Sequence, residues 1–136
     1  MRLVDWEARL MGVLGEWRDR EFEWSASDCS NLACEVTEAL TGRPDVLADL
    51  RGLYHDAASA AALIAALGFR DIGDLIASRW PETPTAFAHR GDIGFCPDVG
   101  PLCLGIVMGP VLVCTNENGA GLHAVPRAKL KRAFKV

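Results

Sequence analysis

Apolar side chains recur every three or four residues in the first part of the chain. They are Leu3, Trp6, Leu10, Val13, Leu14 and Trp17. This spacing places them on one face of an α-helix, and Asp5 stands where a short acceptor side chain can cap the N-terminus. The pattern predicts an amphipathic helix over residues 5–18.

Capping and breaking residues delimit three more predicted helices. The segment 28–40 follows Ser27 and Asp28, either of which can cap it, and a glycine follows its end. Similar signals predict two further helices over 57–67 and 71–80, which end at a glycine and before a proline. All four helices are expected before residue 81.

The second part of the chain has a different pattern. Short alternating or β-branched runs are separated by proline and glycine turns, which is typical of strands joined by tight connections. The predicted strands are 93–96, 103–108, 111–115 and 122–125. Residues 133–136 could add an edge strand. Helices followed by antiparallel strands indicate an α+β fold. We expect one domain over 1–136, with N-terminal helices packed on a C-terminal antiparallel β-sheet.

Composition excludes some classes of partner. The chain has 136 residues and a net charge of −4, which argues against nucleic-acid binding because phosphate contacts require a clustered basic surface. The basic residues within 127–135 are expected to be a solvated edge. The apolar runs are too short for a membrane span and no signal peptide is visible. We expect the protein to be made in the cytosol and to stay soluble.

Cys29 is the first candidate for chemistry among five cysteines. It follows Asp28 in the first turn of a predicted helix, where the helix dipole favours the thiolate and lowers the pKa of the thiol. Trp24 could form one wall of a pocket beside it. The alternative is that Cys29 is a small apolar residue facing the sheet. Cys34 is five residues further on, does not share a helix face with Cys29, and is expected in the core.

Three segments resemble motifs of the NlpC/P60 cysteine peptidases. Trp24-Ser-Ala-Ser-Asp-Cys-Ser-Asn-Leu32 is similar to their nucleophile segment, in which an Asp-Cys pair opens the central helix. Gly91-Asp-Ile-Gly-Phe95 is similar to their Gly-Asp pair before a strand, and Cys103-Leu-Gly-Ile-Val-Met-Gly109 follows the frame His-x-Gly-Ile-x-x-Gly. Small prophage proteins with a comparable cysteine segment also carry Arg-Gly-x-Tyr, here Arg51-Gly-Leu-Tyr54. The resemblance covers about residues 22–126.

The resemblance implies a papain-like, NlpC/P60-type fold and a phage-tail-type protein of the tail tip. Cys29 would be the nucleophile of a peptidoglycan peptidase or amidase, and Trp24, Asp28 and Tyr54 would line its site. The implied partners are tail hub or distal tail proteins and, for an enzyme, peptidoglycan. The protein would then be incorporated in a virion or a virion-like tail.

The sequence departs from that family at the catalytic base. Cys103 stands where the family has its histidine, and Cys114 stands where a third polar residue, often histidine, is found. A thiol cannot replace an imidazole that takes and returns a proton near neutral pH. His123 or His89 could be recruited as a base from an unusual position, although a lone histidine on a strand or turn is more often structural. The domain could therefore be a working peptidase or a catalytically degenerate, structural version of one.

A thiol cluster is the remaining alternative. Alternation puts Cys103, Gly105 and Val107 on one face of a strand, and Cys114 shares a face with Leu112. If Cys103 and Cys114 face Cys29, three thiols converge, and Cys96 could make a fourth. Four thiolates suit zinc or an iron–sulfur cluster, although the spacing contains no CxxC pair. A register slip of one residue would put Leu104 in place of Cys103, and a disulfide also stays open for a released particle.

Overall fold

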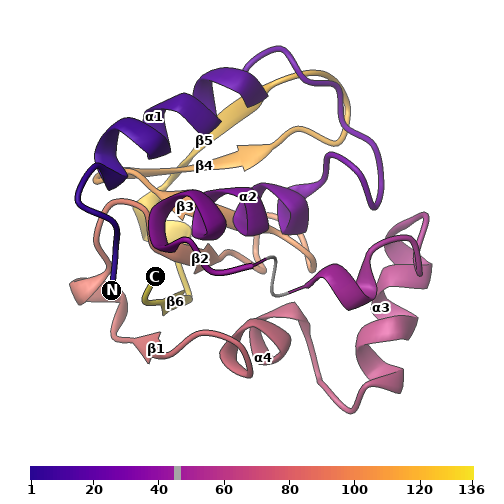
Figure 1. Ribbon diagram of the computed structural model, residues 1–136. Coiled ribbons are helices and arrows are strands. Elements are labelled where there is room, and N and C mark those ends of the chain that lie inside the picture. Colours follow the sequence, from indigo (N-terminus) through magenta and orange to yellow (C-terminus); the bar gives the residue numbers. More distant parts are fainter. Residues whose placement is uncertain (45–46) are drawn as a thin grey trace.

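Two helices lie side by side on one face of a six-stranded antiparallel sheet in the computed structural model, which describes residues 1–44 and 47–136 (Figure 1). The helices are α1 (Trp6–Trp17), α2 (Cys29–Thr41), α3 (Ala57–Ala66) and α4 (Ile72–Ala77), with short 3-10 turns η1 (Ala48–Leu50), η2 (Thr85–Phe87) and η3 (Arg127–Lys129). The strands are β1 (Glu82–Thr83), β2 (Ile93–Phe95), β3 (Leu104–Val107), β4 (Val111–Thr115), β5 (Leu122–Pro126) and β6 (Arg132–Phe134). The prediction of an α+β protein with helices first and antiparallel strands second is confirmed.

The order of strands corrects one expectation. The sheet runs β1-β6-β2-β3-β4-β5, so the last strand lies between β1 and β2 and is not an edge strand. Phe134 pairs with Ile93 on one side and with Glu82 on the other. The edge strand next to β6 is instead the two-residue strand β1. Its flanking prolines hid it in the sequence, yet proline is tolerated at a sheet edge because one side of the strand forms no ladder.

The fourth helix is shorter than the predicted span 71–80. It begins after Asp71, whose carboxylate accepts the backbone N–H of Asp74 at 2.8 Å, and it ends at Ala77. The last residues of the predicted helix instead lead into Pro81, and a residue that precedes proline is disfavoured in helical conformation. Local capping therefore gave the start of this helix correctly but not its end.

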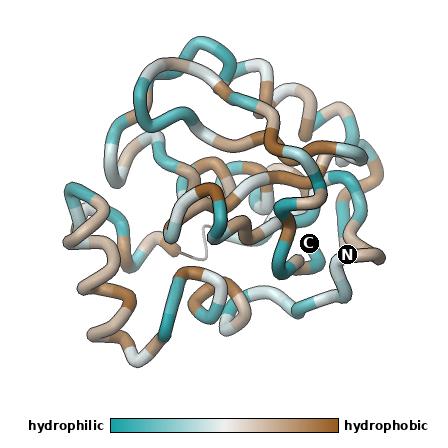
Figure 2. The backbone as a smooth tube through the Cα atoms, turned by 180° about the vertical axis from the view of Figure 1, so that it is seen from behind, coloured by the Kyte–Doolittle hydropathy of each residue, from teal (hydrophilic) through white to brown (hydrophobic). Residues whose placement is uncertain are grey.

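Alternation along the strands divides their side chains between two layers. Phe95 and Leu104 pack in the cluster that faces α2, α3 and α4, and Ile106 packs in the cluster that faces α1 and α2. The opposite face carries a second layer of buried residues: Cys96, Val107, Leu112, Cys114, Val125 and Ala133. In Figure 2 the hydrophobic stretches run through these central strands, whereas many hydrophilic stretches lie in the outer turns.

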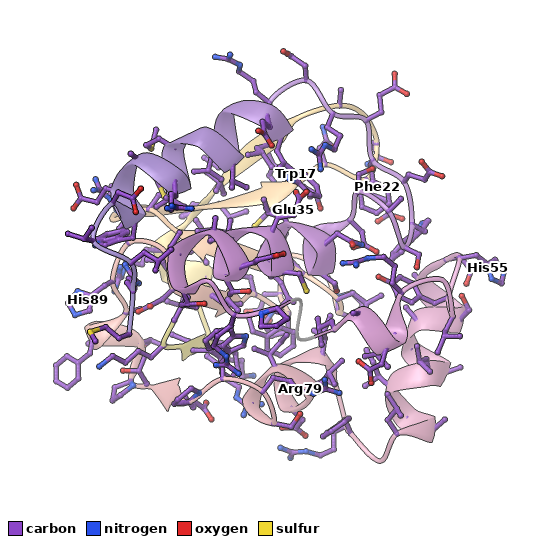
Figure 3. The ribbon with its side chains drawn as sticks, in the orientation of Figure 1. Trp17, Phe22, Glu35, His55, Arg79 and His89 are labelled. Atoms are coloured by element: carbon purple, nitrogen blue, oxygen red, sulfur yellow. The ribbon has the colours of Figure 1, made fainter. Side chains whose placement is uncertain are left out.

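Helices α1 and α2 are joined by both apolar and polar contacts. Leu10 and Trp17 of α1 pack with Leu32 and Leu40 of α2, and all four are almost fully buried. The Trp17 indole N–H donates to a carboxylate oxygen of Glu35, and both side chains lie between the two helices in Figure 3. None of the described helices is long and apolar enough to cross a lipid bilayer.

The two ends of the chain meet at a buried carboxylate. Asp92 is 1 % exposed and accepts the Arg2 guanidinium at 2.8 Å and the backbone N–H of Val136 at 3.0 Å. Its second oxygen accepts the backbone N–H of His89 at 2.8 Å. The N- and C-termini accordingly lie side by side in Figures 1 and 2.

A close contact between strands depends on Gly105. A Cβ atom on this residue would lie 2.7 Å from the Cys114 Sγ and 3.0 Å from the Val113 carbonyl oxygen. We expect Gly105→Ala to lower the free energy of unfolding by about 1–3 kcal/mol, because overpacking forces neighbouring atoms to move. Chemical denaturation would measure this.

The matched control is Gly12→Ala on α1, where a Cβ atom would meet nothing within 4 Å. That change should raise the free energy of unfolding by roughly 0.5–1 kcal/mol, because alanine is the better helix former. If Gly105→Ala were as stable as Gly12→Ala, the close strand contact would be contradicted.

Candidate functional site

The start of α2 is fixed by a cap that the sequence predicts. Asp28 precedes the helix in extended conformation, and its Oδ1 accepts the backbone N–H of Asn31 at 3.0 Å. The same oxygen accepts the Asn31 side-chain amide at 2.8 Å. This cap satisfies an N–H group that the helix itself cannot satisfy. It also places Cys29 in the first turn, as expected.

The second oxygen of Asp28 joins two other parts of the chain. Its Oδ2 accepts the Ser25 backbone N–H at 2.9 Å and the Tyr54 hydroxyl at 2.5 Å. The Tyr54 ring meets the Trp24 ring edge to face, with centroids 6.5 Å apart. Burial first, and the hydrogen bond to Asp28 second, raise the pKa of Tyr54. The three residues predicted to line the site, Trp24, Asp28 and Tyr54, are therefore brought together.

The Arg-Gly-x-Tyr segment is docked on the start of α2 by side-chain hydrogen bonds. The Arg51 Nε donates to the Asn31 Oδ1 at 2.6 Å, and the Gly52 N–H donates to the Ser25 Oγ at 2.5 Å. Gly52 has a φ of +84°, which glycine adopts without strain. Sequence reasoning missed Ser25, Asn31 and Arg51 as partners. The available signal was the presence of two short motifs, 24–32 and 51–54, whose polar side chains can hydrogen-bond with each other.

A cavity of about 410 Å³ opens beside Cys29. Helices α2, α3 and α4 and the segment before β3 supply mostly apolar walls. The apolar lining includes Leu50, Ala60, Ile64, Leu75, Leu102 and Leu104. Trp24, Tyr54 and His123 also line it. The volume and the apolar walls are those of a small-molecule or side-chain binding site.

The Cys29 thiol is held in its protonated form. It is partly buried and donates to the Leu102 carbonyl oxygen at 3.0 Å. Burial, and then the charge of Asp28, raise the pKa of Cys29 to about 12. The prediction of a lowered pKa is therefore wrong. A helix dipole contributes only about 0.3–1 kcal/mol at an exposed site, which is too little to offset these two effects.

The structure brings Cys103 and Cys114 to the same cavity from the other layer of the sheet. Their Sγ atoms are 3.7 Å apart, and both residues pack with Cys96. Leu104, and not Cys103, shares a side-chain cluster with Cys29. Cys29, Cys103 and Cys114 nevertheless all line the cavity, whereas Cys96 is not among the described residues that line it.

The three thiols of this layer have unequal acidities. Hydrogen bonds from the Cys114 and Cys96 thiols, and the nearby His123, lower the pKa of Cys103. The hydrogen bond to Cys103, followed by burial, raises the pKa values of Cys96 and Cys114. Cys103 is the half-buried member and the other two are buried. A thiolate in this layer would therefore form first at Cys103.

The thiols do not form a recognisable metal centre. In residues 1–44 and 47–136, no group of three or more His, Cys, Asp or Glu side chains is arranged to hold a metal ion. The hypothesis that Cys29, Cys96, Cys103 and Cys114 bind zinc or an iron–sulfur cluster stays a prediction.

The two candidate histidines line different hollows of the molecule. His123 pairs with Cys114 in the β4–β5 ladder and lines the cavity. His89, labelled in Figure 3, is not among the described residues that line the cavity and instead lines a separate hollow with Thr41, the last residue of α2. Leu40, which precedes Thr41, is about 16 Å from Cys29 along the helix axis, at 1.5 Å per residue. The structure therefore does not bring His89 to Cys29.

The comparison with protein families assigns the whole chain. Residues 1–136 match the model of a family described as a domain of unknown function, DUF6950. The chain belongs to this family. No curated protein and no solved structure matches it. The description of the DUF6950 family states no activity, so the chemistry of this member is inferred from the geometry around Cys29.

Proposed function

We propose that this DUF6950 domain is a catalytically degenerate, papain-like module of NlpC/P60 type that serves as a structural part of a phage tail or a related particle. The sequence resemblance supports the family type. The Asp28-capped helix with Cys29 in its first turn, packed on an antiparallel sheet, is compatible with it. The tail assignment rests on the resemblance to small prophage proteins.

The state of Cys29 carries the proposal that the module is inactive. Its thiol donates to a carbonyl oxygen and has a pKa of about 12. The thiolate, which is the nucleophilic form, is therefore strongly disfavoured at neutral pH. A cysteine peptidase needs a base within hydrogen-bonding reach of its nucleophile. Thiols of Cys103 and Cys114 line the cavity instead, and a thiol is a poor general base at this pH.

We expect the protein to release no soluble fragments from purified peptidoglycan. Wild-type protein and Cys29→Ala should both match buffer, because the Cys29 thiol at the start of α2 is protonated and cannot attack an amide bond. Chromatography of the supernatant would measure the fragments, with an active NlpC/P60 enzyme as the positive control. Fragment release by the wild type that disappears in Cys29→Ala would contradict the inactive state.

A recruited base is the second candidate function, and one observation favours it. His123 lines the same cavity as Cys29. If this imidazole activates the thiol, the domain is a cell-wall peptidase or amidase with an unusual pair. The same assay separates the two functions, because fragment release would then be lost in both Cys29→Ala and His123→Ala. His89→Ala, away from the cavity, is the matched control.

The structural role predicts a stable protein partner. A tail hub or distal tail protein encoded by a neighbouring gene would bind the domain when the two are produced together. Co-elution of the two proteins in size-exclusion chromatography would support the role. A domain that elutes alone beside each neighbouring tail protein would count against it.

A further inference from the structure

Cys103, which directly precedes β3, and Cys114 of β4 have their sulfur atoms in contact. The Cys103 Sγ lies 3.7 Å from the Cys114 Sγ, and their side chains belong to the layer on the far side of the sheet from α2. The pairs Ile106–Val113 and Val107–Leu112 fix the register of β3 on β4. Continuing that register puts Gly105 opposite Cys114, with Cys103 two residues further along. The two cysteines are therefore diagonal neighbours.

Gly105 is the reason why a diagonal pair can meet. Diagonal Cα atoms in a ladder are about 7–8 Å apart, which is long for a disulfide. A Cβ on Gly105 would lie 2.7 Å from the Cys114 Sγ, so that sulfur occupies the space above the glycine. Its position there brings it to Cys103. Side-chain rotation together with a small backbone movement then has to close the remaining distance to a bond of about 2.05 Å.

We propose that Cys103 and Cys114 form an oxidisable dithiol, which a low-molecular-weight disulfide converts into an intrachain disulfide in the wall of the cavity. This modification site goes beyond the structural role proposed above and does not depend on it. The bond would join β3 to β4 beside the Cys29 cavity. Both cysteines are free in the structure described here.

The reaction proceeds in two thiol–disulfide exchanges. The Cys103 thiolate attacks one sulfur of oxidised glutathione, which forms a mixed disulfide and releases one glutathione thiolate. The Cys114 thiol loses its proton to solvent and attacks the Cys103 sulfur, which releases the second glutathione. The protein loses two protons and two electrons, and one glutathione disulfide is reduced to two thiols.

Exposure and contact select the two participants. Cys103 is the half-buried thiol of this layer and is accessible to an oxidant, whereas Cys114 and Cys96 are 1 % and 0 % exposed. Cys96 is also a neighbour, because its N–H donates to the Cys103 carbonyl oxygen at 3.0 Å. The register of β2 on β3 puts Cys96 directly opposite Cys103, so Cys96 is the competing partner, and the 3.7 Å contact between the Cys103 and Cys114 sulfur atoms is the observation that favours Cys114. Cys29 packs in a different side-chain cluster.

The positions of methionine make the pairing measurable. Cyanogen bromide cleaves after Met11 and Met108, so that fragment 109–136 holds Cys114 and fragment 12–108 holds the other four cysteines. Full-length protein would be treated with a chelator and then with oxidised glutathione. We expect a mass loss of two hydrogens and nearly complete linkage of the two fragments until a reductant is added. Release of free fragment 109–136 after oxidation would overturn the proposal.

Single substitutions identify the partner of Cys114. Linkage should be lost in Cys103→Ser and Cys114→Ser and should persist in Cys96→Ser and Cys29→Ser. Linkage that persists in Cys103→Ser, or that is lost only in Cys29→Ser, would assign a different pair and would also overturn the proposal. If a variant does not fold, the wild-type mapping still shows whether Cys114 is linked to fragment 12–108 at all, and free fragment 109–136 overturns the proposal without any variant.

Discussion

Asp92→Ala is expected to lower the free energy of unfolding by about 3–5 kcal/mol, which is the effect of removing one partner from a buried ion pair. The carboxylate is 1 % exposed and is the shared acceptor of Arg2, His89 and Val136. Its removal leaves the Arg2 Nη2 and two backbone N–H groups without this acceptor, while the other Arg2 nitrogens keep the carbonyl oxygens of Val136 and Arg90. Urea denaturation followed by tryptophan fluorescence would measure the loss.

The loss should be large because the carboxylate connects distant parts of the chain. Arg2 and Val136 are separated by almost the whole sequence, and Asp92 leads directly into β2 at the centre of the sheet. A domain has a total stability of only about 5–15 kcal/mol, so the variant would be near its unfolding threshold. The Gly-Asp pair of the sequence thus has a structural role here.

The matched control is the exposed ion pair of Asp5 with Arg9 on α1. Asp5→Ala also removes an aspartate from an arginine, but water solvates both groups, so the free energy of unfolding should hardly change. If Asp92→Ala and Asp5→Ala were equally stable, the link between the chain ends would not contribute to stability.

Local patterns predicted the elements of this fold more closely than their arrangement. The helix predicted over 28–40 is found at Cys29–Thr41, and the strand predicted over 111–115 is found unchanged. Both depend on neighbouring residues, namely a cap, a glycine and a two-residue alternation. The place of β6 depends on pairing with segments about 40 and 50 residues earlier, and three residues carry too little pattern to specify such pairing.

The candidate site, like the fold, was predicted well in its local features and less well in features that depend on distant parts of the chain. Alternation correctly placed Cys103 with Val107, and Cys114 with Leu112, in one layer. It could not show that Leu104 and Ile106 form the layer next to the helices, because both layers are apolar. The pKa of Cys29 was mispredicted for a related reason. A dipole can be read from helix position, whereas burial depends on segments far away in the sequence.

Asp28→Ala is expected to lower the free energy of unfolding by about 3–5 kcal/mol and to open the site at the start of α2. Loss of an N-cap costs about 0.5–2 kcal/mol. Each buried donor left without an acceptor costs about 1–3 kcal/mol more. The second carboxylate oxygen accepts the Ser25 N–H and the Tyr54 hydroxyl, which are only partly buried, so each adds the lower end of that range. Asp28 itself is 2 % exposed, so water cannot take the position of its carboxylate as an acceptor.

The loss of Asp28 should also change the surroundings of Cys29. The Asp28 charge is the second cause of the raised pKa of that thiol, after burial. Without the charge, and with the 51–54 segment released, the Cys29 thiol should be deprotonated more readily and alkylated faster. The rate of iodoacetamide labelling at Cys29, followed by peptide mass spectrometry, would measure this. An unchanged labelling rate in a folded Asp28→Ala protein would contradict the electrostatic role of Asp28.

Two control substitutions separate capping from docking. Asp56→Ala removes an exposed N-cap from α3, where the cap forms a capping box with Ser59, and should be much less destabilising because water can solvate the freed groups. Tyr54→Phe keeps the cap of α2 and removes only the hydroxyl that Asp28 accepts. If the docking of the 51–54 segment stabilises the helix start, the free energy of unfolding of Tyr54→Phe should lie between the values of the wild type and of Asp28→Ala. A Tyr54→Phe protein as stable as the wild type would assign the whole effect of Asp28 to its cap and to the Ser25 contact.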